Sequence, residues 1–269
     1  MTTNDPPGTA LITGASKGIG AIYADRLARR GYDLIVVARN GPALDELARQ
    51  LRQETGHTVD VEAADLSRSA GVARVETILR ENEDITLLVN NAGIGAQAPL
   101  LESDVDEMET MIDINVIALT RLTYAAVPGF VARGKGTLIN IGSATAIAPE
   151  NLNGVYGATK AFVLALGHSL QSEVADKGVR VQTVLPASTA TDFWAVAESK
   201  GRGGPPESLM DPEAMVDAAL VGLDNGELVT LPSLQDPEDW NQFERLRREI
   251  RPRLVNAKPA PRYRSTAAR

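Results

Sequence analysis

Short runs rich in β-branched and other apolar residues alternate with longer segments of helical periodicity along most of this chain. The runs occupy residues 10–13, 33–38, 59–63, 86–90, 137–141, 179–185 and 228–231. They carry few charges, as expected of strands that a parallel sheet buries on both faces. Because strands that alternate with helices form parallel sheets, the pattern predicts an α/β fold. We expect a single domain with a doubly wound, mostly parallel seven-stranded sheet and helices on both faces.

The segments between the runs supply the predicted helices and indicate the domain boundaries. Helical periodicity covers residues 18–30, 42–53, 69–80, 105–127, 155–176, 212–223 and 237–250. We expect a flexible N-terminus at residues 1–8, one domain at residues 9–255 and a disordered tail at residues 256–269.

The alternation stops at residues 187–211, where five glycines and prolines crowd together. They are Gly201, Gly203, Gly204, Pro205 and Pro206. Because long loops inside compact domains are usually functional, we expect residues 188–210 to form a lid over the substrate.

Charge and cysteine content exclude several classes of protein. The 269 residues carry 27 Lys and Arg against 35 Asp and Glu, a formal net charge of −8. This charge gives no general attraction to nucleic acid or to an anionic membrane, so neither is expected as a partner. The lack of cysteine excludes disulfides, thiolate nucleophiles and cysteine-ligated metals. We see neither a signal peptide nor an uninterrupted apolar run of about 18 residues, and expect a cytoplasmic protein with no membrane segment and no metal site.

A glycine-rich turn follows the first run directly and leads into the first helical segment. It reads Thr13-Gly14-Ala15-Ser16-Lys17-Gly18-Ile19-Gly20. A strand, such a turn and a helix place backbone N–H groups and the positive end of a helix dipole against a pyrophosphate. Glycine-rich turns can also serve only to reverse a chain, but this strand and this helix are the context that a dinucleotide site requires. We therefore expect a dinucleotide cofactor to contact Gly14, Ser16, Lys17, Gly18, Ile19 and Gly20.

The end of the second run indicates which dinucleotide is bound. A carboxylate at this point would bind the ribose hydroxyls of NAD and repel the 2′-phosphate of NADP. The chain has Ala38 and Arg39 there instead. Arg39 can pair with the phosphate through its planar guanidinium, and Lys17 can add a second positive charge. Both cations could be ordinary surface charges, but together with the missing acid they favour NADP(H) over NAD(H).

Tyr156 and Lys160 lie four residues apart in a predicted helix, and Ser143 ends the predicted strand before it. Residues four apart project from one face of a helix, so the Lys160 ammonium can lie beside the Tyr156 phenol. A phenol with its ordinary pKa near 10 is a poor base at neutral pH until a neighbouring cation stabilises its phenolate. A lone tyrosine on a helix more often serves packing, but Ser143 and Lys160 favour an acid–base role for Tyr156.

With these motifs in order, the chain resembles the short-chain dehydrogenases and reductases from about residue 9 to about residue 232. The further matching residues are Asp65, Asn90-Asn91-Ala92-Gly93, Asn115 and Thr191. The resemblance implies a Rossmann fold and an NADPH-dependent oxidoreductase. Such an enzyme moves a hydride between nicotinamide and a carbonyl or alcohol carbon of a small organic substrate.

The resemblance also implies roles for individual residues. Tyr156 would be the general acid in reduction and the general base in oxidation, and Ser143 would hold the substrate oxygen. Lys160 would bind the nicotinamide ribose and lower the pKa of Tyr156, while Asn115 would hold a water that relays protons. The implied cofactor contacts outside the glycine turn are Arg39, Asp65, Leu66, Asn91, Ala92, Gly93, Tyr156, Lys160, Pro186 and Thr191.

Other interpretations of these features stay open. Asn91 could pin a loop through backbone hydrogen bonds, and Asp65 could cap the helix that begins near Ser67. An epimerase or dehydratase could use the same cofactor fold, but those enzymes are longer chains that have an additional substrate domain. A catalytically silent dinucleotide-sensing regulator would be expected to lose Tyr156 or Lys160.

Two further expectations concern the nicotinamide end and association. The family usually has Pro-Gly where this chain has Pro186-Ala187, and alanine tolerates fewer backbone angles than glycine. The helices that carry Asn115 and Tyr156 are apolar around more of their circumference than one sheet contact needs, as in residues 162–166. In the resembling family these helices pair across a two-fold axis, so we expect a homodimer or homotetramer.

Overall fold

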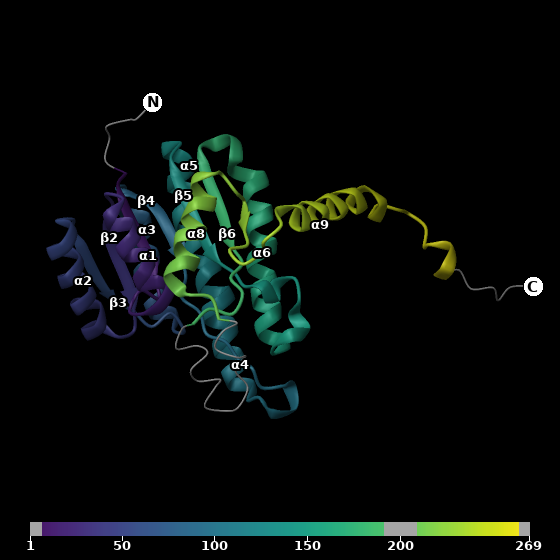
Figure 1. The fold of residues 1–269 in the computed structure, drawn as a ribbon, viewed down its shortest axis with the longest axis horizontal. Helices are drawn as coiled ribbons and strands as arrows, with labels where there is room; N and C mark the ends of the chain where they lie inside the picture. The colour runs from purple at the N-terminus through teal and green to yellow at the C-terminus, as the bar shows by residue number, and fades with distance from the viewer. Residues whose placement is uncertain (1–6, 191–208, 264–269) are drawn as a thin grey trace, which may run out of the picture. The chain divides into compact units, whose positions relative to one another are not determined.

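The computed structural model describes residues 7–190 and 209–263 and contains one seven-stranded, fully parallel sheet (Figure 1). The strands are β1 (Thr9–Thr13), β2 (Asp33–Ala38), β3 (Val59–Ala63), β4 (Ile85–Asn90), β5 (Gly136–Ile141), β6 (Val179–Val184) and β7 (Val229–Thr230). Their order in the sheet is β3-β2-β1-β4-β5-β6-β7. The order reverses between β1 and β4, and ligands of doubly wound folds bind at the carboxyl ends of the strands beside such a reversal. The predicted fold is confirmed.

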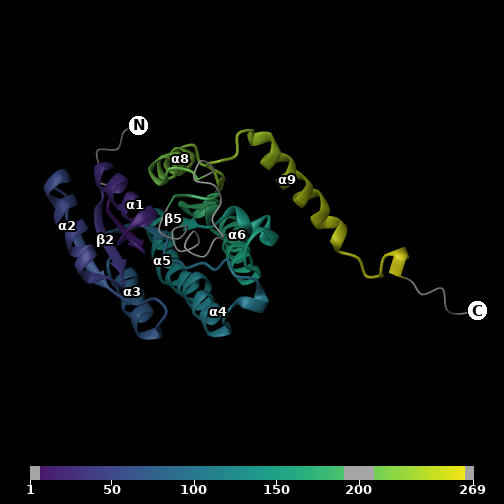
Figure 2. The same ribbon diagram turned by 60° about the horizontal axis from the view of Figure 1, so that its bottom comes forward.

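Helices cover both faces of the sheet, as Figures 1 and 2 show. The helices of one layer are α1 (Gly18–Arg29), α2 (Gly41–Thr55) and α8 (Pro212–Asp224). The helices of the other layer are α3 (Ser69–Glu81), α5 (Leu119–Arg133) and α6 (Gly154–Val174). Each layer buries its own apolar cluster, because the central strands place apolar side chains on both faces. A short helix, α4 (Val105–Ile112), precedes α5.

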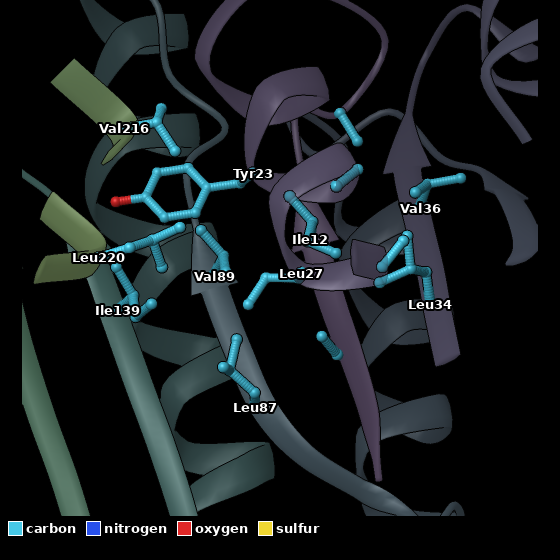
Figure 3. Close-up of a cluster of buried hydrophobic side chains, with 14 of the residues drawn as sticks. Ile12, Tyr23, Leu27, Leu34, Val36, Leu87, Val89, Ile139, Val216 and Leu220 are labelled. Carbon is cyan, nitrogen blue, oxygen red and sulfur yellow. The ribbon is translucent and has the colours of Figure 1, made fainter. Parts of the chain in front are cut away.

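The core between α1, α8 and the sheet contains Tyr23, the largest fully buried side chain in the described part of the chain (Figure 3). Its ring lies among Val89, Val216 and Leu220. Burial raises the pKa of the Tyr23 phenol, and its hydroxyl has no hydrogen-bond partner among the described residues. The ring therefore serves packing, while the hydroxyl adds a desolvation cost.

The helix that carries Asn115 is longer and less regular than predicted. We expected it to end at Val127, before Pro128, but α5 continues to Arg133. Proline removes one backbone donor, and the neighbouring residues of α5 still bury one face against the sheet, which holds the helix together. Asn115 itself lies in a π-helical turn, Asp113–Ala118, between α4 and α5. Such turns often occur at functional sites.

The chain divides into two units, residues 1–233 and residues 234–269. The first unit holds the sheet and the helices α1 to α6 and α8. The second contains α9 (Pro237–Ile250), which the sequence pattern had included in the main domain, and two 3-10 turns, Arg251–Leu254 and Pro261–Tyr263. The second turn lies inside the predicted disordered tail. The predicted lid falls largely on residues 191–208, outside the described residues.

One helical stretch in the described part of the chain, Val105–Arg133, has the length and composition of a membrane-crossing helix. More than half of its most apolar window is buried inside the structure. The core helix of a layered α/β unit has the same properties, so composition alone does not distinguish the two. The expected cytoplasmic location and the absence of a membrane segment stay predictions.

Candidate active site

The turn after β1 depends on glycine at two positions for steric reasons. Gly14 has a φ of +68°, a backbone conformation that is strained for any residue with a side chain. A Cβ atom there would also lie 2.8 Å from the Asn91 amide nitrogen. A Cβ atom on Gly20 would overlap the Gly14 carbonyl oxygen and lie 2.5 Å from the same nitrogen. The first turn of α1 therefore packs directly on the end of β1 and on the loop after β4.

Side-chain hydrogen bonds fasten this glycine turn to the loop after β4. The Asn91 amide donates to the carbonyl oxygens of Thr13, at 2.8 Å, and Gly14, at 3.2 Å. The Thr13 hydroxyl accepts from the backbone N–H groups of Asn91 and Ala92, both at 3.0 Å, and donates to the Val89 carbonyl. Asn91 thus pins a loop, as one interpretation of the sequence had it, while it also lines the cavity described below.

The start of α1 fits the pyrophosphate of a dinucleotide. Lys17 occupies the N-cap position, and its side chain makes no capping hydrogen bond to the first turn. The backbone N–H groups of a helix start point along the helix axis, and the helix dipole adds positive potential there. Because glycine keeps the approach open, these N–H groups can bind phosphate oxygens.

The edge at the ends of β2 and β3 carries the residues predicted to meet adenosine. Arg39 follows β2 and is exposed. Asp65 follows β3, and its carboxylate accepts from the Ser67 N–H and hydroxyl at 3.0 and 2.8 Å, so it closes the turn after β3. It does not cap α3, which begins at Ser69 with Arg68 at its N-cap position. Partial burial acts to raise the pKa of the Asp65 carboxyl, but the Ser67 hydrogen bonds and the charges of Arg39 and Arg68 outweigh it, so the pKa is lowered.

Ser143, Tyr156 and Lys160 converge at the other end of the same cleft. Ser143 follows β5, and its hydroxyl oxygen accepts from the Thr145 N–H at 3.2 Å. Tyr156 and Lys160 both lie in the first two turns of α6, and all three side chains are at least nine-tenths buried. The Lys160 ammonium donates to the Ile141 carbonyl at 2.9 Å and lies 5.8 Å from the centre of the Tyr156 ring.

Burial shifts the pKa values of both titratable groups. It raises the pKa of the Tyr156 phenol, against the opposite effect of a hydrogen bond with Ser143. It lowers the pKa of the Lys160 ammonium to about 8. The expectation that Lys160 lowers the Tyr156 pKa is therefore not met in the protein alone, because desolvation of the phenolate outweighs the stabilising interactions. Oxidised nicotinamide, when bound, would add a positive charge that favours the phenolate.

Asn115 joins the loop after β4 to the helix that carries Tyr156. Its side-chain oxygen accepts from the Ile94 N–H at 3.0 Å, and its amide donates to the Ile94 carbonyl at 2.9 Å. The same amide donates to the Thr159 hydroxyl at 3.1 Å, and Asn115 is almost fully buried. Asn115 therefore positions this part of the site, and its predicted role in holding a water stays a prediction.

One cavity of about 630 Å³ brings most of the predicted residues together. The predicted residues that line it are Gly14, Lys17, Gly18, Ile19, Asn91, Ala92, Gly93, Ser143, Tyr156, Lys160 and Pro186. Those that lie outside its lining are Ser16, Gly20, Arg39, Asp65, Leu66 and Asn115. Thr191 is outside the described residues.

The cavity also has walls that we did not predict. Further lining residues are mostly apolar or small: Ile94, Ile141, Gly142, Ala144, Thr145, Leu152, Ala187, Ser188, Thr189 and Ala190. Met108 and Met111 of α4 pack with Tyr156, Ile94 and Leu152 in a separate apolar cluster. The position of Ile94 directly after Gly93 was a usable signal, whereas nothing in the sequence relates α4 to Tyr156.

Alanine in place of the usual glycine at residue 187 causes no backbone strain. No non-glycine residue in the described part of the chain has a positive φ, so Ala187 adopts a conformation that alanine tolerates. The preceding residue is held in place, because the Pro186 carbonyl accepts from the Ala144 N–H at 2.8 Å. Alanine is therefore compatible with the backbone of this cavity wall.

Comparison with known proteins gives consistent matches. Residues 8–201 match the family described as short chain dehydrogenase. The very-long-chain 3-oxoacyl-CoA reductase of Anas platyrhynchos is 34% identical over 230 residues, which cover 83% of this chain and 72% of that protein.

Two solved structures are similar over nearly the whole chain. A short-chain dehydrogenase from Sphingobium yanoikuyae, in complex with NADPH, is 45% identical with a TM-score of 0.91, covering 96% of this chain and 100% of that one. A bulky-bulky ketone specific alcohol dehydrogenase from Comamonas testosteroni is 44% identical with a TM-score of 0.88, covering 97% of this chain and 99% of that one.

Proposed function

Because the chain belongs to the short-chain dehydrogenase family and is an oxidoreductase of CH–OH and C=O groups, we propose that it is an NADPH-dependent ketone reductase with Tyr156 as its general acid. The observation that carries the proposal is one cavity lined by both the glycine turn and the buried group of Ser143, Tyr156 and Lys160. A cofactor held by the turn can then present its reactive end to these three side chains.

The residues present fit a nicotinamide dinucleotide. The start of α1, where the N-cap side chain makes no capping hydrogen bond, fits its pyrophosphate, and Arg39 and Lys17 fit a 2′-phosphate. Bound NADPH would supply the hydride, and the Lys160 ammonium would hold the nicotinamide ribose. The NADPH complex of the Sphingobium yanoikuyae relative supports this choice of cofactor. We expect NADPH to bind at least about ten times more tightly than NADH, a difference of about 1.4 kcal/mol.

The chain's own residues then handle the substrate oxygen and its proton. The Ser143 hydroxyl oxygen accepts from the Thr145 N–H, and in the protein alone the hydroxyl also hydrogen-bonds with Tyr156. When a substrate binds, the Ser143 proton would be donated to its carbonyl oxygen. The Tyr156 hydroxyl donates a second hydrogen bond and transfers its proton as the carbonyl oxygen becomes an alcohol. Both groups stabilise negative charge where it develops. Its raised pKa keeps Tyr156 protonated at neutral pH, as a general acid must be.

The walls of the cavity favour a ketone with apolar groups on both sides of its carbonyl. Ile94 and Leu152 lie on one part of the wall, and Ala144 and Ala187 on another. Small side chains beside the catalytic group leave space for a substrate larger than an aldehyde. The bulky-bulky ketone specific relative from Comamonas testosteroni agrees with this substrate class.

The test is a reduction assay with NADPH against ketones of graded size and against 3-oxoacyl thioesters. We expect the highest kcat/KM on ketones with two bulky apolar substituents, and loss of activity in Ser143→Ala. A chain that binds NADPH yet reduces none of the carbonyl compounds would instead support the dinucleotide-sensing regulator. A preference for nucleotide sugars would support the epimerase or dehydratase alternative.

We also propose that copies of the chain pair through α5 and α6. Ile117, in the π-helical turn before α5, Tyr124 of α5 and Phe162 of α6 are exposed by 47%, 69% and 37%. Exposed apolar side chains on adjacent helices favour a two-fold contact. Sedimentation at micromolar concentration should show a dimer or tetramer, and a monomer would contradict this proposal.

A further inference from the structure

Helix α9 is an amphipathic helix with one apolar face. Trp240, Phe243, Leu246 and Ile250 fall within about a third of the helix circumference, and the Trp240 and Phe243 rings stack at 5.2 Å. Phe243, Leu246 and Ile250 are exposed by 44%, 56% and 38%. At 1.5 Å per residue this stripe is about 15 Å long. A stripe of this length on a helix normally packs against a second surface.

The same segment is strongly basic. Residues 240–262, which we call the arm, contain seven Lys and Arg but only two Glu. Both glutamates lie in α9, and Glu244 accepts from Arg247 at 2.7 and 2.8 Å. Arg251, Arg253 and Lys258 form no ion pair with any residue in the described part of the chain. By contrast, residues 1–233 carry a formal charge of −12, with 18 basic and 30 acidic residues.

A second surface of the main unit has the complementary composition. Residues 100–113, which we call the ledge, contain six Asp and Glu and no Lys or Arg. Leu100, Leu101 and Val105 within it are exposed by 80%, 94% and 76%. The carboxylates of Glu107 and Glu109 form no ion pair with a residue that the structure describes. The ledge thus combines open apolar side chains with unneutralised negative charge.

We propose that the arm of one copy binds the ledge of a second copy, and that each copy gives its arm and receives that of its partner. The apolar stripe of α9 would cover Leu100, Leu101 and Val105, and the arginines beyond it would face the ledge carboxylates. Charge complementarity selects a second copy of this chain, because the arm is basic and the ledge is the acidic surface with the most exposed leucines. Such a reciprocal exchange closes with two-fold symmetry.

The contact lies on the outer side of a helix that belongs to the active site. Val105, Glu109 and Ile112 of α4 face outward, while Met108 and Met111 pack inward against Tyr156. The arm contact is distinct from the pairing of α5 and α6 proposed above, since it uses other residues. A partner's arm on α4 would place a second copy behind the wall of the cavity.

Site-specific cross-linking of the full chain tests the proposal, because the chain has no cysteine of its own. One chain carries Leu101→Cys and a tag that changes its mass, and the other carries Leu246→Cys. After the two are mixed, a short bis-maleimide should join them into a dimer of the mixed mass. Gln53→Cys, an exposed position on α2, replaces Leu101→Cys in the matched control and should give at least about tenfold less product.

Charge reversal separates the arm contact from other modes of association. Arg251→Glu/Arg253→Glu in the arm chain, or Glu107→Lys/Glu109→Lys in the ledge chain, should each lower the cross-link yield several-fold. Combining the reversed arm with the reversed ledge should restore it, and raising salt from about 0.05 M to about 0.5 M should weaken the unmodified contact.

Three outcomes would overturn the proposal. The first is no cross-link above the control in the mixture. The second is a cross-link that forms only when both cysteines are in one chain, which would mean that the arm folds onto its own ledge. Anionic lipid vesicles that bind the unmodified chain and abolish the cross-link would show that the arm is a membrane-binding helix instead.

Discussion

The two ends of the active-site cleft are built on different physical principles. The cofactor turn consists of backbone and glycine, fastened by Thr13 and Asn91, and it works because nothing larger than hydrogen stands at Gly14 and Gly20. The catalytic end consists of buried polar side chains, whose burial shifts their pKa values. A substitution at the cofactor turn should act through steric overlap, and a substitution at the catalytic end should act on proton transfer and hydrogen bonding to the substrate. The two kinds of effect separate when stability and turnover are measured on the same variants.

The largest effect should come from Tyr156→Phe, which removes a hydroxyl and keeps the ring. Turnover should fall by about 10² to 10⁴-fold, the usual contribution of a positioned general acid. The melting temperature and the NADPH dissociation constant should change little, because the ring still packs against Met108 and Met111. Stopped-flow reduction and fluorescence titration of NADPH measure the two quantities. Near-normal turnover would show that Tyr156 is not the general acid. The proposed contrast between a cofactor end that acts by steric fit and a catalytic end that acts by proton transfer would then fail.

The pH dependence of oxidation sharpens the same point. Burial raises the pKa of the Tyr156 phenol in the protein alone, so its phenolate is scarce at neutral pH. Bound oxidised nicotinamide adds a positive charge, which should lower that pKa. Alcohol oxidation should therefore increase as pH rises toward the Tyr156 pKa of the complex, and the ultraviolet difference titration of parent against Tyr156→Phe should show a lower pKa with NADP⁺ than without it. Equal values would contradict the argument.

Lys160→Met should separate stability from activity. Burial lowers the Lys160 pKa from an ordinary 10.5 to about 8, so between these pH values the unfolded chain binds the proton that the folded chain has lost. Burying the Lys160 charge therefore lowers the free energy of unfolding by about 3 kcal/mol at all pH values below about 8. This destabilisation decreases above pH 8 and disappears as the pH reaches 10.5. Lys160→Met removes this destabilisation, but it also removes the hydrogen bond to the Ile141 carbonyl, which offsets about 1 kcal/mol of the stability gained.

The expected result is that Lys160→Met is more stable than the parent at pH 7, by up to about 2 kcal/mol, and that this advantage shrinks toward pH 10. Turnover and NADPH affinity should both fall. Chemical denaturation at the two pH values measures the stability difference. A variant equally stable relative to the parent at both pH values would show that Lys160 is not strained by burial.

Gly20→Ala should lose both stability and cofactor affinity, in contrast to Lys160→Met. Its Cβ atom would overlap the Gly14 carbonyl oxygen and the Asn91 amide nitrogen, and a hydrogen bond between these two groups holds them in place. Overpacking of this kind costs about 1 to 3 kcal/mol. Gly154→Ala is the matched control, since a Cβ atom there meets nothing within 4 Å. Calorimetric melting of both variants, with and without NADPH, would contradict the steric argument if the two behaved alike.

The smallest effect is expected at the end of β2, where Arg39 is predicted to meet the adenosine part of the cofactor. Arg39→Asp should remove the pairing with the 2′-phosphate and make NADH the better cofactor, a change of at least about tenfold in the ratio of dissociation constants. Arg68→Asp, another exposed cation near Asp65, is the control for a general change in charge. Equal affinities for NADPH and NADH in the unmodified protein would show that Arg39 is an ordinary surface charge.

Much of the fold was determined by the sequence alone, for local reasons. The seven strands appear where β-branched runs predicted them. Strands that alternate with helices along a chain form a parallel sheet, and the helices then cover both of its faces. The spacing of Tyr156 and Lys160 placed both on one face of a helix, and the glycine turn marked the end of β1. Such features depend on residues a few positions apart, which sequence patterns record directly.

Tertiary structure decided what depends on residues far apart in the chain. Thr13 binds Asn91 across 78 positions, and Asn115 reaches Thr159 across 44, neither of which any local pattern shows. The packing of Met108 and Met111 on Tyr156 follows from the placement of α4, and the burial of Tyr156 raises the pKa that residue spacing had suggested would fall. Desolvation depends on everything that surrounds a group, so only the folded chain determines its sign and size.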